Sequence, residues 1–535
     1  MMRASIKEYG PFALTNMLEK SCDRRTERQM ERIQPCSSLK SGEHKEAQNG
    51  CIFLAVQQGF QARYLLRTDI LPELKKRIGK IVILSPNAEE EYFRDEFHKD
   101  HVIVEKFDTE KCEDFLLKSR GQRFFRLVRS FILNGKYDIQ TVNDIYRLFV
   151  KESSGIQGRR KIRLLVIDLL VKRLRASKVL RQFFLRLEGK LFQPDIHRDL
   201  FKRHRPDLVV TTSLGNVGRG YDLFVMREAK KHGAKIVPVI LSWDNTTGKG
   251  LGGVIPDYII AWTDIMKGEL MMYHDIPGNR IFVGGIAHFD IYYKEELSMS
   301  REKALESLGL DPSKKLIFFG TKSPNSYPWN ADIARILADA IDQGQFPFPA
   351  QLLIRLHPLY YVVKKTKTRE FVPFIKEFEW LAQKYSFVKI DRPQILSDRL
   401  TMDMPESEQT KLNSILNHTD VLVNMFSTLN IEAAILDVPL VNVVFEGNAE
   451  RRENSRQNID IDFRQTHNQR IVQSGATRLC HTPQELIETV RAYLVDRSLD
   501  RSERAALVQQ EAGPYKGTAG RKIAEILSHL TKNPD

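Results

Sequence analysis

The stretch from Asp420 to Phe445 constrains the fold more than any other part of the chain. An apolar run ends at Met425-Phe426-Ser427-Thr428, a segment with helical spacing follows, and Pro439 separates that segment from a second apolar run. Short apolar runs bounded by turn residues are typical of buried parallel strands, and the segment between them has the period of a helix. The stretch therefore predicts one βαβ unit.

A phosphate is the ligand that this unit favours. Ser427 and Thr428 are predicted to lie at the carboxyl end of the first strand and at the N-terminus of the helix. Free N–H groups and the positive end of the helix dipole face outward there. Glu432, one turn further on, is placed to accept hydrogen bonds from ribose hydroxyls. The alternative is that Ser427 only caps the helix and Glu432 only complements its dipole.

Alternation of strand and helix extends over most of the 535 residues, enough for two or three domains. We expect an α/β fold with two parallel domains, 49–295 and 310–510, joined by a polar linker, and a cleft where their strand ends meet. A loosely ordered extension (1–48) precedes them and a C-terminal helix (511–535) follows. Strands are predicted at 51–56, 81–84, 102–104, 208–212, 236–240, 258–262, 281–286, 316–320, 352–356, 387–390, 421–423 and 440–445.

Residues 110–195 interrupt this pattern with a helical, basic insert in the first domain. Between Arg159 and Lys190 the chain has many Lys and Arg residues but only two acidic residues, Asp168 and Glu188. Leucines and phenylalanines supply an apolar side. Such a helix lies in a membrane interface or binds a polyanion. The alternative is a solvated charged face on a helix that packs against its own domain.

The composition excludes several classes of protein. A hydrophobic fraction of 42% and a charged fraction of 28% are typical of a globular protein. No leader and no apolar run near about 18 residues are found, which predicts a cytoplasmic protein that at most lies on the inner face of a membrane. Five cysteines without a CxxC pair argue against disulfides and zinc.

A net charge of +14 predicts an anionic partner, which is a nucleic acid, an acidic membrane surface or a phosphorylated small molecule. Nucleic acid is not expected, because the charge is not interleaved with stacking aromatic residues on strands. The glycine-rich turn Ser213–Gly220 departs from GxGxxG and gives no nicotinamide or flavin site. Its Gly218 lets the backbone approach a ligand or a neighbouring loop.

Four short motifs in the second half carry donors suited to oxyanions. They contain Thr321 and Lys322, Arg355 and His357, Ser427 and Thr428, and Arg521 at the start of the last helix. Each motif follows a predicted strand or opens a helix. An enzyme that breaks a bond to a nucleotide phosphate without a metal can stabilise the leaving charge with amides, hydroxyls and a cationic His or Arg. His357, fixed by Pro358, is the strongest candidate.

From about Leu316 to Leu527 the order of these motifs resembles the C-terminal half of GT-B glycosyltransferases. LLIRLHP, the later Ser-Thr pair and the final helix look most like those of CDP-glycerol glycerophosphotransferases and bacterial capsule and surface-polysaccharide transferases. The resemblance implies two facing Rossmann-like domains, the first for the acceptor and the second for the nucleotide donor. It also implies that His357, Ser427 and Thr428 contact the donor phosphate.

The general base would then come from the first domain. Asp244, in a polar loop after a strand, is the preferred candidate, and His288 and Asp290 are next. The alternative is that Asp244 only forms an Asx turn with Asn245. The first strand-to-helix loop, with Gln58, Gly59 and Arg63, is expected to touch the acceptor or the reacting phosphate.

The sequence thus predicts a metal-independent transferase that needs no cofactor and moves a sugar or polyol phosphate from a nucleotide-activated donor. The acceptor would be a surface glycan or a lipid-linked molecule, and the basic insert would dock on the acidic membrane that carries it. Two alternatives stay open. One is an enzyme like UDP-N-acetylglucosamine 2-epimerase, and the other is a non-catalytic basic protein that binds membrane or RNA.

Overall fold

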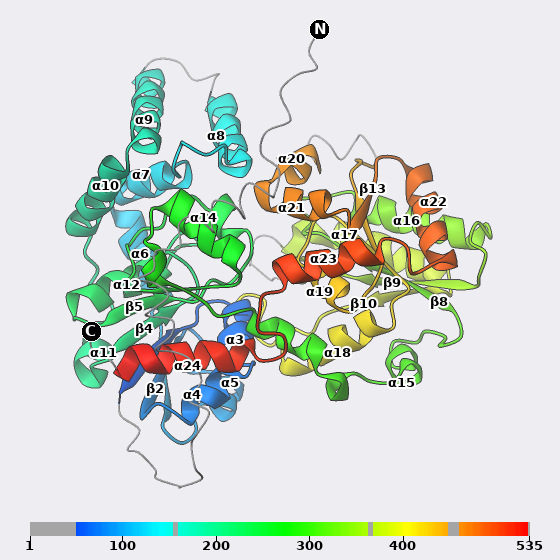
Figure 1. Ribbon diagram of the computed structural model, residues 1–535, viewed down its shortest axis with the longest axis horizontal. Helices are drawn as coiled ribbons and strands as arrows, with labels where there is room; N and C mark the ends of the chain where they lie inside the picture. Colours follow the sequence, from blue (N-terminus) through cyan, green and yellow to red (C-terminus); the bar gives the residue numbers. More distant parts are fainter. Residues whose placement is uncertain (1–49, 154–158, 362–367, 448–458, 533–535) are drawn as a thin grey trace.

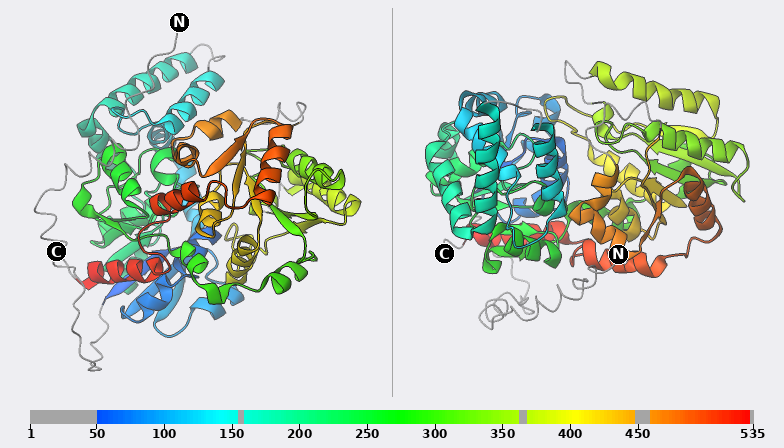
Figure 2. Two further views of the ribbon diagram at one scale, coloured as in Figure 1. Left: turned by 45° about the vertical axis from the view of Figure 1, so that its right-hand side comes forward. Right: turned by 90° about the horizontal axis from the view of Figure 1, so that it is seen from above.

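The chain folds into two α/β halves, each built on a parallel sheet (Figure 1). The computed structural model describes residues 50–153, 159–361, 368–447 and 459–532, and the predicted extension 1–48 lies outside them. The view from above shows the two halves side by side (Figure 2).

The first sheet has the strand order β3-β2-β1-β4-β5, and an isolated bridge between Val239 and Ile260 extends it to a pair of further strands. Its strands are β1 (Cys51–Ala55), β2 (Lys80–Ser85), β3 (Val102–Lys106), β4 (Leu208–Thr211) and β5 (Lys235–Pro238), followed by the pair β6 (Ile259–Ala261) and β7 (Ile281–Val283). The helices of this half are α3 (Gly59–Leu65), α4 (Ile70–Lys75), α5 (Glu91–Phe97), α6 (Thr109–Lys118), α7 (Arg120–Ser130), α8 (Gln140–Ser153), α9 (Arg159–Ala176), α10 (Lys178–Leu191), α11 (Arg198–His204), α12 (Asp222–Lys231), α13 (Asn245–Gly248), α14 (Asp264–His274) and the 3-10 helix η2 (Gly278–Arg280).

The second sheet has the strand order β10-β9-β8-β11-β12-β13. Its strands are β8 (Lys315–Gly320), β9 (Ala350–Arg355), β10 (Val388–Asp391), β11 (Val421–Asn424), β12 (Leu440–Val443) and β13 (Thr477–Cys480). The joint and the helices of this half are η3 (Ala287–Tyr293), η4 (Glu295–Leu297), α15 (Arg301–Glu306), α16 (Asn330–Asp342), η5 (Pro358–Tyr360), α17 (Thr368–Lys384), α18 (Glu406–Asn417), α19 (Leu429–Ile435), α20 (Ile459–Arg464), α21 (Thr466–Ser474), α22 (Pro483–Val495), α23 (Arg501–Glu511) and α24 (Ala519–Lys532).

Counted within each half, the strand order reads 3-2-1-4-5 in the first sheet and 3-2-1-4-5-6 in the second, which is the doubly wound Rossmann arrangement. The predicted fold class of two parallel α/β domains is confirmed. In such a sheet the ligand crevice lies at the carboxyl ends of strands 1 and 4, where the order reverses. In the second half these two strands are β8 and β11, which pair directly.

In its described residues, the region predicted as a helical insert forms five helices, α6 to α10, and no strand. Helices α7 to α10 surround an apolar core that also includes Leu251, and no helix among the described residues is long and apolar enough to cross a bilayer. The elements that the sequence patterns missed include the short strand β13 and the helices α15, α20, α21 and α23. The joint, predicted to be polar, instead contributes Ala287, Phe289 and Tyr292 to the core.

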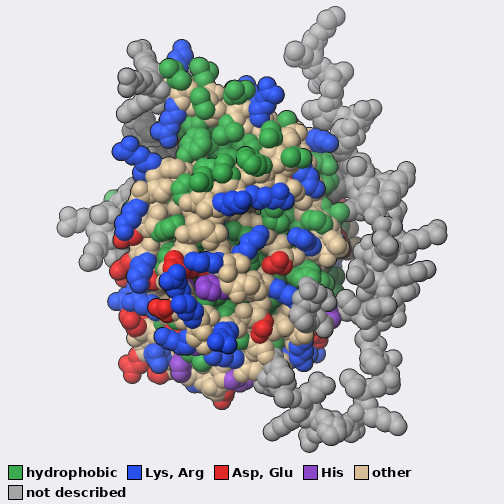
Figure 3. Space-filling model, turned by 90° about the vertical axis from the view of Figure 1, so that its left-hand side faces the viewer, with side chains coloured by type: hydrophobic (Ala, Val, Ile, Leu, Met, Phe, Trp, Pro, Cys, Tyr) green, Lys and Arg blue, Asp and Glu red, His purple; other side chains and the backbone are tan. Residues whose placement is uncertain are grey.

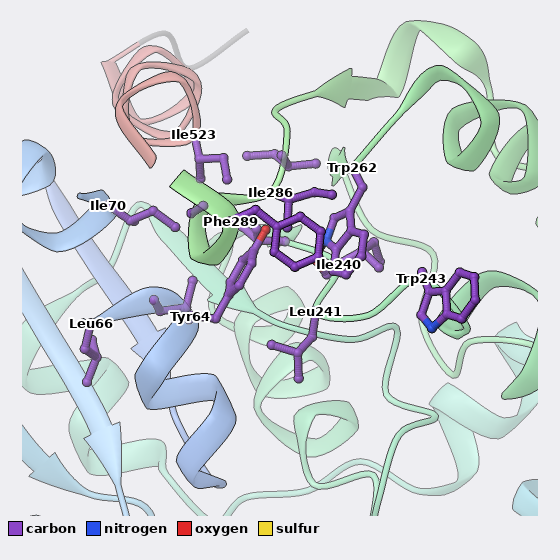
Figure 4. Close-up of a cluster of buried hydrophobic side chains, with 14 of the residues drawn as sticks. Tyr64, Leu66, Ile70, Ile240, Leu241, Trp243, Trp262, Ile286, Phe289 and Ile523 are labelled. Atoms are coloured by element: carbon purple, nitrogen blue, oxygen red, sulfur yellow. The ribbon is translucent and has the colours of Figure 1, made fainter. Parts of the chain in front are cut away.

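The last helix, α24, returns to the first half and packs against α4 and η3. Figure 4 shows Ile523 of this helix directed at a cluster that includes Tyr64, Trp262 and Phe289, all buried. Both oxygens of the buried Asp290 carboxylate accept hydrogen bonds from the first two amides of the helix, those of Ala519 (3.0 Å) and Gly520 (2.8 Å). The two halves are therefore linked by the chain at two places, the joint and α24.

Buried charge also joins the halves. The guanidinium of Arg67, which follows α3, pairs with Asp403 of the second half at 2.6 Å and with Glu96 at 2.7 Å. The side chains of Arg67 and Asp403 are 1% and 0% exposed. Tyr92 donates a further hydrogen bond to Asp403 at 2.7 Å. Removing one partner from such a pair leaves the other charge buried without compensation.

We predict that Arg67→Met lowers the free energy of unfolding by about 3 kcal/mol, because the Asp403 carboxylate stays buried without its counter-charge. Urea denaturation of the purified variant measures this. The matched control is Arg77→Met, since Arg77 pairs with Glu73 at the surface and should cost less than about 1 kcal/mol. Equal losses for both variants would contradict the importance of the buried pair.

Candidate functional site

Three adjacent strands bring most of the predicted phosphate donors to one edge of the second sheet. β8 lies between β9 and β11, each about 4.8 Å away. Thr321 follows β8, His357 follows β9 and Ser427 follows β11, all at the carboxyl ends. The backbone N–H of His357 donates to the Thr321 hydroxyl at 2.8 Å. The sequence prediction that these side chains share an edge is therefore met by the sheet order.

The loop that carries Ser427 is held by buried amides. Phe426 has a left-handed backbone (φ 46°), which is strained for a bulky residue, and its N–H donates to the Asn442 side chain at 2.7 Å. Asn442 and Asn424 both bond to Asn430, and all three are fully buried. This network was missed by the sequence analysis, although an asparagine in each of the two strands was a signal.

Ser427 and Thr428 are half-exposed, so a ligand can reach their hydroxyls. The Ser427 hydroxyl accepts the N–H of Leu429 at 3.2 Å, which is the capping role considered above. The following helix, α19, has only seven residues, so its dipole contributes little. The side-chain hydroxyls of Ser427 and Thr428 are therefore the main groups that this part of the edge offers to a ligand, and the helix dipole is secondary.

The imidazole of His357 is neutral, which corrects the cationic role predicted for it. Burial, together with the charge of Lys322, lowers the pKa of His357 to about 4. Its Nδ1 accepts the N–H of Leu359 at 3.1 Å, so the proton of the neutral ring sits on Nε2. His357 is therefore a hydrogen-bond donor without a charge.

Lys322 supplies the positive charge beside His357. Its Nζ pairs with Asp462 of α20 at 2.5 Å, and the lysine side chain is 17% exposed. The same charge contributes to lowering the pKa of His467, which burial chiefly sets at about 3. His467 lies against the first half, because its Nδ1 is 3.1 Å from the Thr247 hydroxyl. Lys322 thus lies near the boundary between the halves.

Arg355 was predicted to bind the donor, but the structure shows its guanidinium paired with two acids. Its guanidinium hydrogen-bonds Asp391 and pairs with Glu408 at 3.0 Å, and Lys411 also bonds both carboxylates. An arginine whose donors are used by two buried acids has a structural role. The prediction did not take into account Asp391 and Glu408, two acidic residues that lie later in the chain.

Glu432 lies at the domain boundary, as its place in the unit predicts, but it already has a partner. The hydroxyl of Tyr292, in η3, donates to its carboxylate, and both side chains are buried. Burial and this carboxylate raise the pKa of Tyr292 well above its usual value. The positive charges of Arg63 and Arg355 act on the same tyrosine, so Arg63 lies near this pair.

On the first-domain side, Arg63 is the residue with an unused charge. It is half-buried and has no ion-pair partner among the described residues. Gln58 instead packs against Gly218, where an added Cβ would lie 2.6 Å from its Nε2. Gly59 was predicted to touch the acceptor, but its N–H donates to the carbonyl of Thr401 in the second half at 2.8 Å. Its role is contact between the halves.

None of the three predicted general bases has a suitable environment. Burial would raise the pKa of Asp244, but the charge of Lys249, whose Nζ lies 2.7 Å away, outweighs it and the pKa is held at about 2. Such a carboxylate is a weak base. His288 packs on the rings of Tyr64 and Phe289, and burial lowers its pKa well below its usual value.

Asp290 and Arg521 are corrected by the position of α24. Burial raises the pKa of Asp290 to about 6, but its two oxygens cap this helix. Its predicted role as a general base is therefore wrong. Arg521 is exposed on α24, which packs on the first half, where an added Cβ on Gly520 would meet Asp69. The prediction that Arg521 completes the donor site of the second half is not supported.

No group of three or more His, Cys, Asp or Glu side chains that would hold a metal ion is present in the described ranges. A cavity of about 660 Å³ lies between α10 and loops of the first half, away from this edge. The site at the domain boundary therefore consists of donors along a sheet edge.

No family model and no curated protein matches the sequence. Among solved structures, the chain is similar to a UDP-GlcNAc 2-epimerase from Methanocaldococcus jannaschii (16% identity, TM-score 0.47, covering 90% of this chain and 99% of that one). It is also similar to a UDP-GlcNAc 2-epimerase from Neisseria meningitidis bound to UDP-GlcNAc (12%, 0.46, 90% and 99%). A glycosyltransferase from Rickettsia africae is a third (11%, 0.44, 91% and 99%). Both kinds of enzyme occur among these structures.

The neutral state of His467 makes the stability of the domain boundary depend on pH. The ordinary pKa of 6.5 applies to the unfolded chain and a value of about 3 to the folded one. The unfolded chain therefore binds the proton first as the pH falls through 6.5, and stability is lost.

We predict that His467→Gln, which does not titrate, shows a shallower loss of stability than the unchanged chain between pH 7 and about 5. The difference in slope should approach about 1.4 kcal/mol per pH unit at the acid end. Denaturant unfolding at a series of pH values measures it. Parallel curves for the two proteins would show that His467 is charged in the folded state.

Proposed function

We propose that the protein transfers a sugar or polyol phosphate from a nucleotide-activated donor, whose phosphates bind at the carboxyl edge of the second sheet. The observation that supports this most is the neutral His357, which carries its proton on Nε2 and lies beside the ammonium group of Lys322. The hydroxyls of Ser427 and Thr428 lie at the same edge, at the switch point where doubly wound sheets bind ligands.

The chemistry of this site suits a phosphate leaving group. In sugar transfer the acceptor oxygen bonds to the anomeric carbon, the bond from that carbon to the bridging oxygen breaks, and the electron pair stays on the nucleoside diphosphate. In polyol-phosphate transfer the acceptor oxygen bonds to the phosphorus of the polyol phosphate, the phosphoanhydride bond breaks, and the electron pair stays on the nucleoside monophosphate. The Lys322 ammonium group, which also pairs with Asp462 at 2.5 Å, then compensates part of the charge, and His357 and the two hydroxyls donate hydrogen bonds to the phosphate oxygens. We propose that these donors act without a metal ion or another cofactor. A neutral donor costs less to hold beside Lys322 than a second cation would.

The acceptor, on this proposal, enters from the first half, where Arg63 has an unused charge close to Tyr292 and Glu432. A guanidinium in that position suits a phosphorylated acceptor such as a lipid-linked glycan. We propose a surface glycan or lipid-linked acceptor of cell-envelope polysaccharide synthesis, used at the cytoplasmic face of the membrane. The residue that removes the acceptor proton is not one of the three predicted bases.

We predict that His357→Ala reduces the rate of donor turnover by about 10²-fold or more, because one of the donors to the leaving phosphate is lost. Binding of CDP-, CMP-, UDP- and GDP-activated compounds is first screened by thermal shift, and turnover of the compound that binds is then followed by nucleotide release. The unfolding midpoint shows whether the variant keeps its fold.

The matched control is His418→Ala. His418 is also half-buried in the second half, but it follows α18 and bonds the carbonyl of Met299 at 2.7 Å, at the opposite edge of the sheet. Its variant should turn over the donor normally. Product analysis without added acceptor separates transfer from epimerisation, since an epimerase changes the sugar with no acceptor present. Absence of binding by every nucleotide-activated compound would contradict the proposal.

A further inference from the structure

The insert carries apolar side chains on its outer surface as well as on its inner one. In α9, Ile167, Val171 and Leu174 are buried in the insert core. The outer surface of α9 and α10, which we call the outer face of the insert, exposes the following side chains by 41–74%: Ile162, Leu165, Val166, Leu169, Val179, Leu180, Phe183 and Leu191. Exposed apolar residues this numerous on two neighbouring helices mark an interaction surface.

The spacing of these residues makes the outer face continuous along each helix. In α9, Ile162, Leu165, Val166 and Leu169 follow the i, i+3, i+4, i+7 pattern of one helix side. In α10, Val179, Phe183 and Leu191 share a side at intervals of four and eight. Figure 3 shows hydrophobic side chains gathered over the upper part of the molecule, where the insert lies, with Lys and Arg around them.

The outer face is bordered by cations without acidic partners in the described part of the chain. They are exposed and lie on the same two helices: Lys161, Arg163, Arg173, Lys178, Arg186 and Lys190. By contrast, the buried acid of α10, Glu188, faces inward and pairs with Arg129 and Arg227. Glu188 therefore does not neutralise the exposed cations of the outer face.

A cavity of about 660 Å³ opens beside this border, between α10 and the segments 251–257 and 274–280. Its lining includes three unpaired cations of α10, Lys178, Arg186 and Lys190, together with Lys230 and Arg280 from other elements. The lining has two carboxylates: Asp275 is bound by Arg181 at 2.7 Å, and Asp257 accepts the N–H of Ile236 at 2.9 Å, so the five cations outnumber them. The cavity therefore has a positive field and a size that suits an anionic headgroup.

We propose that the outer face of the insert docks on an anionic phospholipid bilayer. The apolar side chains enter the boundary between headgroups and acyl chains, and the bordering cations and the cavity beside α10 hold lipid phosphates. A helix with an apolar side flanked by Lys and Arg lies in the plane of such an interface. This inference goes beyond the transfer reaction and is tested without any donor.

Charge decides between the bilayer and the other occupants. Two copies of the chain pairing through this same face would bring their like charges together. The central part of a protein interface is depleted in lysine. A nucleic acid would use the cations but would leave the aliphatic side chains in water, since single strands bind through stacking aromatic residues.

The test is flotation of the full chain with vesicles of phosphatidylcholine alone and of phosphatidylcholine with phosphatidylglycerol. We expect binding to the anionic vesicles only, weakened by added salt. Two variants address the two parts of the surface. One combines Leu165→Ser, Leu169→Ser, Val179→Ser and Phe183→Ser, and the other combines Lys178→Glu, Arg186→Glu and Lys190→Glu.

Each variant should reduce partitioning onto anionic vesicles by about tenfold or more. The control changes comparably exposed residues of the second half, Val495→Ser and Lys303→Glu, and should bind as the unchanged chain does. All the substituted side chains are exposed, and circular dichroism verifies the fold. Unchanged vesicle binding by the serine variant, or no binding by the unchanged chain, would overturn the proposal. A self-association of the chain that the serine variant abolishes would assign the face to a second copy instead.

Discussion

The direct pairing of β8 with both β9 and β11 is the constraint on which the site depends. Parallel strands with a reversal of order between the first and the fourth must leave their connecting loops on opposite sides of the reversal. The edge between them is therefore open to a ligand, and residues from loops far apart in sequence meet there. Thr321, His357 and Ser427 are brought together by this topology alone.

Electrostatics then separates the residues of this edge into two groups. In the first group, buried charged side chains at the domain boundary form ion pairs: Arg67 with Asp403, and Arg470 with Glu269 and Glu511. His357 and His467 are instead kept neutral by burial, each with Lys322 contributing. The site thus presents one lysine charge and several uncharged donors, a set that suits a phosphate more than a neutral sugar hydroxyl.

The strands of both halves were predictable because buried parallel strands read as short apolar runs between turn residues. These runs also indicate which residues lie just after each strand end. They therefore predicted that Thr321, His357 and Ser427 lie at the same edge. Residue roles were less predictable, since they depend on partners distant in sequence. Asp290 accepts amides 229 and 230 residues later, which no local pattern indicates. Arg355 was read as a free cation because its acids, Asp391 and Glu408, come from other elements.

The most direct test is a crystal structure of the protein with the nucleoside diphosphate that it binds most tightly. If the edge of the second sheet is the donor site, phosphate oxygens will lie within hydrogen-bond distance of His357 Nε2 and of a hydroxyl of Ser427 or Thr428. A nucleotide bound away from this edge, with His357 making no contact to phosphate, would contradict the account.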